Sequence, residues 1–196
     1  MQKKFQKIFY FLLLLVFVGC QTDPNPCSLS QEVLMDIYKL DSITSIPEIR
    51  DRNRDWMKNN YDEPSILDAD SETYRFILSS SFGRTEISRI EKINGQFNVT
   101  KKVFANHQDT IGIIDEFQIS KDVWRNITDS LTINNFWTYP SSIDRRGLDG
   151  ASWSLEGYKP IKDKCTLKNF HSVGRWTPID STFISMCNLL SNLKAK

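Results

Sequence analysis

The chain has 196 residues, a formal net charge of +1 and 40 % hydrophobic residues, a size that suits one packed domain better than two. Its charge is near neutral and of mixed sign, without the basic run that is typical of nucleic-acid-binding proteins, so nucleic acid is excluded as an expected partner. Five tryptophans and this apolar content indicate a packed core and argue against a disordered secreted coat.

The first nineteen residues have the layout of a bacterial export signal. Residues 1–7 contain three lysines and no acidic residue. They are followed by an unbroken apolar or aromatic run over 8–18, and Gly19 then precedes Cys20. Such a run, at about 1.5 Å per helical residue, extends roughly 16 Å and falls well short of the ~30 Å hydrocarbon core of a bilayer. We therefore predict that 1–19 is a cleaved signal peptide rather than a permanent membrane-spanning helix.

The residues around the cut carry a more specific signal. Phe17-Val18-Gly19-Cys20 resembles the lipobox of bacterial lipoproteins, with Phe17 where leucine is usual. In that family the cysteine thiol receives a diacylglyceryl group, the chain is cut before it, and the new amine is usually acylated, as with palmitate. The resemblance implies a mature protein that begins at a lipid-modified Cys20, held in the membrane by about 0.8 kcal/mol per buried methylene. A plain signal with a chance cysteine, or an uncleaved anchor, is the alternative.

Processing at Cys20 changes the charge of the chain and its expected place in the cell. Without the signal the chain has 22 basic and 24 acidic residues, a net charge of −2. In enteric-type lipoproteins an aspartate after the cysteine retains the protein at the inner membrane, and Gln21 stands there instead. For a two-membrane bacterium, the resemblance implies a cell-envelope protein anchored in the outer membrane and facing the periplasm or the cell surface.

Three cysteines remain once Cys20 carries lipid: Cys27, Cys165 and Cys187. They allow one disulfide at most, so a disulfide framework is excluded and the choice between one bridge and none stays open. Cys187 falls on the apolar stripe of a predicted helix, which indicates a buried free thiol.

The start of the mature chain predicts a tether followed by one domain. Residues 20–30 include two prolines and no apolar period, which is typical of a linker that holds a domain off the lipid surface. We expect 31–196 to form a single domain, with a helical N-terminal part over 31–70 and a sheet with helices over 73–193. The two helical stretches expected in the N-terminal part are 30–40 and 46–60.

From residue 73 the sequence alternates in the way that β-strands do. The first four predicted strands are 74–80, 85–93, 96–104 and 112–119. Asn94-Gly95 joins the second to the third and is the strongest short-range hairpin signal, because both turn positions need positive φ. Ser120 can then cap a helix over 121–132, along which apolar residues recur at helical spacing. These residues are Val123, Trp124, Ile127 and Leu131.

The last part of the chain predicts two more strands and a helix. After a linker around 140–147, the strands are 151–158 and 166–176, and the helix is 179–193. One side of this helix presents Phe183, Met186, Cys187, Leu190 and Leu193. The whole pattern predicts an α+β fold: an antiparallel sheet of about five to six strands, with an amphipathic helix after strand four and a C-terminal helix packed on it.

Local signatures of enzymes are absent from the sequence. It contains no G-x-S-x-G elbow, no Gly-rich phosphate loop, no H-E-x-x-H and no C-x-x-C. The two histidines, His107 and His171, are far apart in the chain, so we expect no metal site and no cofactor.

An acidic stretch before the first predicted strand has some features of a calcium-binding loop. Asp68, Asp70 and Glu72 alternate as the first ligands of such a loop do. Thr73 stands where the loop needs glycine and Ser79 where it needs glutamate, so the EF-hand interpretation fails and a solvated acidic loop is expected.

The C-terminal quarter carries the candidate polar site. It reads D-G-x-x-W-x-L-E-G from Asp149 to Gly157 and H-x-x-x-R-W-T-P from His171 to Pro178. This pair of motifs resembles a family of bacterial proteins, many of them exported, that has no assigned activity. The resemblance spans about 73–193 and implies a shared fold unit without a function.

Strand alternation assigns faces to these motif residues. Asp149-Gly150 suits a turn; Trp153 and Leu155 should share one strand face, with Glu156 on the other. On the second strand His171, Val173 and Arg175 share a face. If the strands pair, Glu156 can meet Arg175 or His171, either as a cross-strand ion pair, with Thr177-Pro178 opening the last helix, or in a polar ligand pocket. The candidate site residues are Asp149, Glu156, His171, Arg175 and Trp176.

Two classes of function fit this sequence. The missing catalytic motifs favour a non-enzymatic lipoprotein whose domain binds another envelope protein or a small ligand, with an exposed apolar patch of several hundred Å². The alternative is a hydrolase or lyase for a cell-wall or glycan substrate, in which Glu156 acts with His171 or Asp149 and paired carboxyls lie roughly 5–10 Å apart. A purely structural or inhibitory lipoprotein differs from the first class only in its partner.

Overall fold

The computed structural model describes residues 57–66, 69–106, 113–141, 147, 149–160 and 170–195. All of them belong to one unit, Gln31–Lys196. The predicted signal, the lipidated Cys20, the tether, the helix at 30–40 and most of the helix at 46–60 lie outside the described residues. Cys27, His107 and Cys165 also lie outside them.

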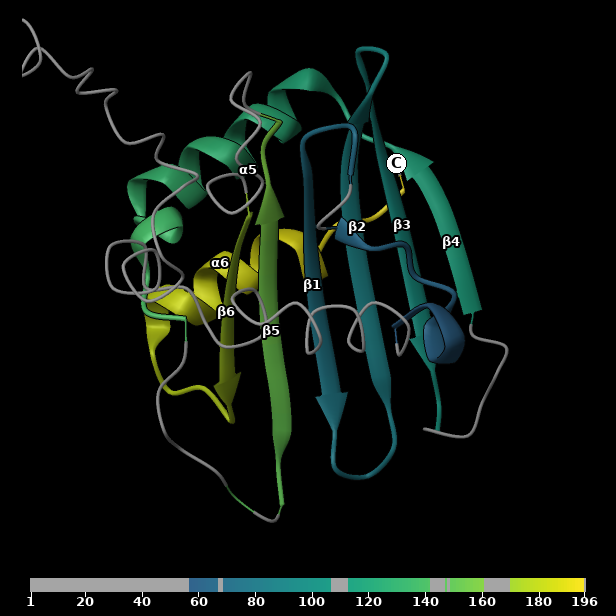
Figure 1. The fold of residues 1–196 in the computed structure, drawn as a ribbon, viewed down its shortest axis with the longest axis vertical. Helices are drawn as coiled ribbons and strands as arrows, with labels where there is room; N and C mark the ends of the chain where they lie inside the picture. The colour runs from purple at the N-terminus through teal and green to yellow at the C-terminus, as the bar shows by residue number, and fades with distance from the viewer. Residues whose placement is uncertain are drawn as a thin grey trace, which may run out of the picture. The chain divides into compact units, whose positions relative to one another are not determined.

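Six antiparallel strands form one sheet in the order β4-β3-β2-β1-β5-β6 (Figure 1). The strands are β1 (Thr73–Ser80), β2 (Thr85–Ile93), β3 (Gln96–Phe104), β4 (Ile113–Gln118), β5 (Ala151–Tyr158) and β6 (Phe170–Trp176). β1 to β4 follow one another as a meander, and β5 then pairs with the free side of β1. The first strand therefore lies inside the sheet. With one helix after β4 and another at the C-terminus, the α+β fold is confirmed.

Local sequence signals set the ends of several elements. Asn94 and Gly95 have φ values of 51° and 80°, as the predicted hairpin turn requires. The helix α5 (Lys121–Ile133) begins after Ser120, whose hydroxyl accepts a hydrogen bond from the Val123 N–H at 3.3 Å. These signals act within a few residues, which is why the sequence alone places them correctly.

The last helix, α6 (Ser181–Ser191), begins later than predicted. Thr177 has a positive φ of 41°, so the chain changes direction there and Thr177-Pro178 does not open the helix. Asp180 is the N-cap instead, and its carboxylate accepts hydrogen bonds from the N–H groups of Thr182 and Phe183.

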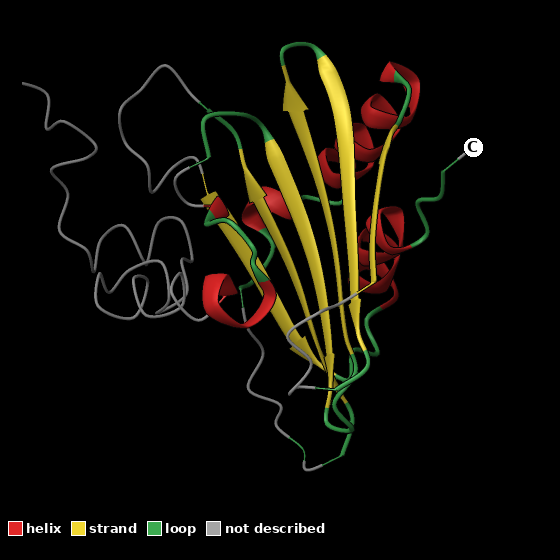
Figure 2. Cartoon of the chain, turned by 90° about the vertical axis from the view of Figure 1, so that its right-hand side faces the viewer, coloured by secondary structure: helices red, strands yellow, loops and turns green. Residues whose placement is uncertain are grey.

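Both helices pack on the same face of the sheet and bury the main core there (Figure 2). The strands contribute Tyr74, Phe76, Ile90, Val99, Leu155 and Val173, and the helical segments contribute Trp124, Ile127, Leu131, Phe136, Phe183, Met186, Cys187 and Leu190. The predicted apolar stripes of both helices face the core, with Val123 and Leu193 only partly buried. Because α6 ends at Ser191, Leu193 lies beyond the helix and not, as predicted, in its last turn. Cys187 is a buried free thiol, as predicted, and burial raises its pKa.

A short segment, 57–66, crosses the opposite face of the sheet and is called the strap below (Figure 2). Its first part, 57–61, is helical, as predicted for the end of 46–60. Asp62 has a positive φ of 50° and Pro64 follows, so the helix ends and the predicted helical part does not continue to residue 70. Apolar contacts of the strap involve Met57 and Tyr61 with Ile87 and Phe104, and Ile66 with Tyr158 and Phe170.

Candidate functional site

The candidate residues of the two C-terminal motifs are divided between the two faces of the sheet. β5 and β6 pair as predicted, in a register that sets Leu155 opposite Val173. Both residues face the helices, so His171 and Arg175 face the helices too, while Glu156 points to the strap face. The predicted contact of Glu156 with Arg175 or His171 is therefore wrong.

Asp149 and Trp176 lie at the end of the sheet where β5 begins. Asp149 is exposed in the bend before β5, and Gly150 has a φ of 148°. A Cβ on Gly150 would lie 3.3 Å from the indole Nε1 of Trp176, so this ring lies against the bend. Glu156 is seven positions after Asp149, roughly 23 Å away at ~3.3 Å per strand residue, which is too far for a paired-carboxylate site.

Arg175 is the centre of a polar cluster beneath α6. Only 6 % of it is exposed. Within the described part of the chain, its guanidinium donates hydrogen bonds to backbone carbonyl oxygens. Nη1 donates to the oxygens of Ser141 at 3.1 Å and Gly174 at 2.7 Å, and Nη2 donates to that of Pro140 at 2.6 Å. Among the described residues, Nε has no partner.

Aromatic rings and one carboxylate complete the surroundings of Arg175. Its guanidinium lies 5.6 Å from the ring centre of Tyr139 and 5.4 Å from that of Phe183. The Tyr139 hydroxyl donates a hydrogen bond to Asp180. Burial and this bond raise the pKa of Tyr139 to about 12, and the same bond lowers the pKa of Asp180. Burial lowers the pKa of Arg175, whereas Tyr139 and Asp180 favour its charged form.

His171 connects β6 to the same segment, 139–141, by a hydrogen bond. It is 2 % exposed, and its Nε2 lies 2.9 Å from the carbonyl oxygen of Tyr139, so this nitrogen carries the proton that is donated. Burial lowers the pKa of His171, and the nearby Arg175 lowers it further. The Gly174 N–H also donates to the Ser141 oxygen at 2.7 Å. This group, the α6-face cluster (Tyr139, His171, Arg175 and Asp180), thus holds 139–141 against the sheet.

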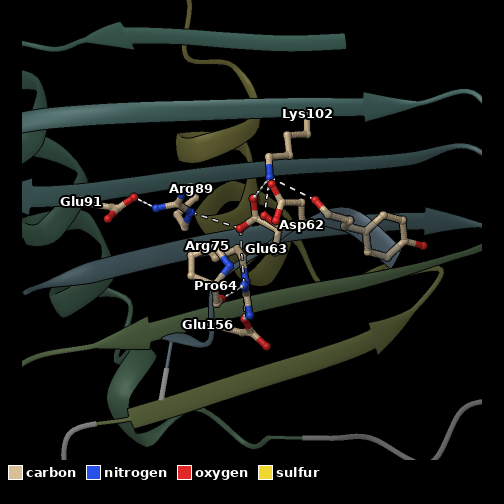
Figure 3. Close-up of polar contacts among 9 residues, drawn as sticks. Asp62, Glu63, Pro64, Arg75, Arg89, Glu91, Lys102 and Glu156 are labelled. Atoms are coloured by element: carbon tan, nitrogen blue, oxygen red, sulfur yellow. Dashed lines mark hydrogen bonds and ion pairs between the residues drawn. The ribbon is translucent and has the colours of Figure 1, made fainter. Parts of the chain in front are cut away.

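Sequence reasoning missed a second polar cluster, on the strap face (Figure 3). At its centre is the carboxylate of Glu63, a strap residue with no exposed surface. Its oxygens lie 2.9 Å from Lys102 Nζ, 3.1 Å from Arg89 Nε and 3.5 Å from Arg75 Nη1. Each cation comes from a different strand, β3, β2 and β1, so one strap side chain connects three neighbouring strands.

The same cations bind further groups of the strap and the sheet. Arg75 pairs with Glu156, Nε at 2.8 Å and Nη2 at 2.7 Å, and its Nη1 donates to the Pro64 carbonyl at 2.9 Å. Lys102 Nζ donates to the carbonyl oxygens of Tyr61 at 3.0 Å and Asp62 at 2.8 Å. Arg89 pairs with Glu91. The strap-face cluster (Glu63, Arg75, Arg89, Glu91, Lys102 and Glu156) therefore balances three cations with three carboxylates.

A hollow of about 870 Å³ opens beside the strap-face cluster, at the end of the sheet where β1 begins and β2 ends. This volume lies within the roughly 300–1,000 Å³ range of small-molecule sites. The wall residues belong to the strap (64–66), the segment 69–73, the end of β2 with its turn (89 and 91–94), and 159–160. Arg89 belongs both to the hollow and to the strap-face cluster.

Most charged groups that line the hollow are already paired. Arg89 pairs with Glu91, and Lys159 Nζ lies 3.6 Å from Glu72, which also accepts a hydrogen bond from the Tyr74 hydroxyl at 2.8 Å. The side chains of Asp70 and Lys92 have no hydrogen bond or ion pair with any residue that the structure describes. Asp70 is exposed, as expected for the acidic loop; Asp68 lies outside the described residues.

Within the described part of the chain, no group of three His, Cys, Asp or Glu side chains is placed to hold a metal ion. No helix of that part is long and apolar enough to cross a membrane. The large apolar side chains with the greatest exposure come from five separate segments rather than from one element. They are Phe82, Ile93, Ile114, Ile133 and Ile179.

Comparison with known proteins adds no relative. No family model matches the chain, and no curated protein matches it. The likeness to lipoproteins at Cys20 and the motif resemblance over 73–193 therefore stay predictions from the sequence.

Proposed function

We propose that the protein is a lipid-anchored domain of the bacterial cell envelope that binds a ligand in the hollow at the end of its sheet. The export signal and the lipobox-like cysteine at residue 20 support the anchor. The hollow beside the strap supports the binding site, because it has the size of a ligand site and is walled by polar side chains from four segments.

One observation favours binding over catalysis: the charged groups of the hollow are engaged with one another. Glu72 and Glu91 each pair with a cation, which leaves Asp70 as the one unpaired carboxylate among the described residues of the lining. Acid–base hydrolysis needs two carboxyl groups with separate tasks, or a carboxylate and a histidine within reach of one substrate. The lining of the hollow contains no histidine among its described residues.

The hydrolase hypothesis loses the geometry on which it depended. Glu156 is in a closed ion pair with Arg75 and does not line the hollow. His171 faces the opposite side of the sheet, and Asp149 lies at the other end of β5. No specific observation favours a second function, so ligand binding by an anchored domain is the single proposal.

The test is photocrosslinking in intact cells that make the full chain. A photoreactive lysine analogue at Lys92, on the rim of the hollow, should gain a covalent small-molecule adduct on irradiation, detected as a mass increase of its proteolytic peptide. The same analogue at Arg125, exposed on α5 across the sheet, is the matched control and should gain none. Equal adducts at both positions, or none at Lys92, would contradict binding in the hollow.

The same cells test the anchor. With the Cys20→Ser substitution the chain should leave the membrane fraction or remain unprocessed, because serine cannot accept the thioether-linked lipid. Normal processing with retention in the membrane would contradict the anchor while leaving the adduct at Lys92 as support for the hollow.

A further inference from the structure

The charges of the hollow define the ligand that it fits. Its described lining contains three carboxylates and three cations, and two of each form ion pairs with one another or with the strap-face cluster. One acid, Asp70, and one base, Lys92, are left without partners among the described residues. Both side chains are exposed. A ligand with one charge of each sign can pair with both, whereas a ligand of a single sign can pair with one.

The two unpaired groups flank the same paired carboxylate. Asp70 lies two residues before Glu72, and the backbone N–H of Lys92 donates to the carbonyl oxygen of Glu72 at 3.0 Å. Glu72 is itself fixed by Tyr74 and Lys159. The two free charges are therefore carried by segments that meet at Glu72, and both residues line the hollow.

The uncharged part of the lining narrows the ligand further. It offers hydroxyl and amide groups from Ser65, Ser71 and Asn94, which can donate to and accept from a peptide unit. The apolar lining is small and aliphatic, from Ile66, Ala69 and two prolines among others. No aromatic ring belongs to the described lining, so the stacking surface that sugars and nucleobases commonly use is not part of it.

Resting on the proposed function, we infer that the hollow binds a short peptide with free termini, its ammonium at Asp70 and its carboxylate at Lys92. The paired ions Arg89–Glu91 and Lys159–Glu72 also line the hollow. Ser65, Ser71 and Asn94 face the backbone amides, and the aliphatic lining suits small apolar side chains. Each end of the peptide forms a charge-assisted contact that a blocked terminus cannot form.

The probe is the dipeptide L-alanyl-L-alanine, titrated into the purified full chain in detergent and followed by calorimetry. The N-acetylated and the C-amidated dipeptides each lack one terminal charge. Each should bind about tenfold more weakly than the free dipeptide, the equivalent of ~1.4 kcal/mol. Equal affinity of the three probes, or no heat of binding at millimolar concentration, would overturn the inference.

Two substitutions test which side chain binds each terminus of the dipeptide. Asp70→Asn should abolish the preference for a free amine, so that the acetylated and free dipeptides bind alike, and Lys92→Gln should do the same for the free carboxylate. Asp122→Asn, on the exposed surface of α5, is the matched control and should leave both preferences intact. Preferences that persist in both hollow variants would place the dipeptide elsewhere and overturn the inference.

The two tests separate the ligand class from the proposed function. A photoadduct at Lys92 in cells, together with no binding of the dipeptide, would contradict the peptide assignment and leave ligand binding in the hollow supported. Absence of both would contradict both.

Discussion

On the strap face of the sheet two buried cations, Arg75 and Lys102, and the partly buried Arg89 meet three carboxylates. On the α6 face one buried cation, Arg175, meets backbone carbonyl oxygens and aromatic rings. The strap-face cluster joins five segments of the chain, the strap and the strands β1, β2, β3 and β5, through full charges. The α6-face cluster fixes one neighbouring segment, 139–141, through dipoles. Both clusters shield charged side chains from water. They differ in which groups are left without a partner when one residue of the cluster is substituted.

That difference bears on stability. Removing one partner of a buried ion pair leaves a charge that is neither solvated nor compensated, whereas removing a cation bound to carbonyls leaves neutral acceptors. The strap-face cluster also borders the hollow through Arg89 and Glu91, whereas no residue of the α6-face cluster lines it. We expect the strap-face cluster to be both the more sensitive to substitution and the one whose condition affects ligand binding.

The largest effect is expected from Glu63→Ala. The substitution leaves two buried cations and the partly buried Arg89 without their shared carboxylate. It should cost roughly 3–5 kcal/mol, either as lower stability of the whole domain or as release of the strap. Urea unfolding followed by tryptophan fluorescence measures the first, and new protease cleavage within 57–66 measures the second.

Two further variants test whether the loss of stability comes from removing the buried charge of Glu63. Glu63→Gln keeps the shape and one acceptor oxygen, so it should fall between the wild type and Glu63→Ala. Glu86→Ala removes an ion pair with Arg84 that is largely open to solvent, and its cost should stay within about 1 kcal/mol. A Glu63→Ala protein as stable as Glu86→Ala, with an unchanged cleavage pattern, would show that the cluster does not hold the strap.

The fold was predictable because its signals are local. The bounds of β2, β3 and β5 follow from alternation and from turn chemistry at Asn94-Gly95, which act between near neighbours. The face of the sheet on which Glu156 lies was also predictable from the sequence. Pairing the apolar Leu155 with the apolar Val173 places Glu156 on the face opposite to that of His171. Taking each strand separately, without aligning their apolar faces, produced the wrong contact.

The strap-face cluster was not predictable in the same way. Glu63 lies in a segment with no period, and its partners Arg75 and Arg89 are 12 and 26 residues away. The side of the sheet on which Arg75 lies was predictable from the sequence. Arg75 stands between the core residues Tyr74 and Phe76, so its side chain must face away from the helices. Nothing in the sequence near Glu63 shows that a strap covers that face, since this depends on how the chain returns across the sheet.

A smaller effect is expected from Arg175→Met. Methionine can fill the space between Tyr139 and Phe183, and the carbonyl of Ser141 still accepts a hydrogen bond from the Gly174 N–H. The loss of the remaining contacts should cost about 1–3 kcal/mol in urea unfolding, less than Glu63→Ala. Dipeptide binding should stay at the wild-type level, because Arg175 is remote from the lining of the hollow. A cost equal to that of Glu63→Ala would remove the distinction between the two clusters.

The smallest effect is a dependence of stability on pH that comes from His171. In the folded protein burial and Arg175 lower the pKa of His171, and the imidazole donates to the Tyr139 carbonyl while neutral. The unfolded chain takes up this proton near its ordinary pKa of about 6.5, whereas the folded protein resists it. Stability is therefore complete above that value and falls as the pH is lowered toward the folded pKa of His171.

Urea unfolding at about pH 7.5 and about pH 5.5 brackets this step while most carboxylates remain ionised. The loss between the two pH values should be smaller in His171→Gln, which has no proton to take up, and should persist in the matched variant His107→Gln. The expected sign is the reverse of that for a histidine paired with a carboxylate, which gains stability on protonation. A His171→Gln protein with the wild-type loss would mean that His171 takes up its proton equally in the folded and unfolded chain. The α6-face cluster would then tolerate a second cation beside Arg175, although Asp180 is the one carboxylate among its four residues.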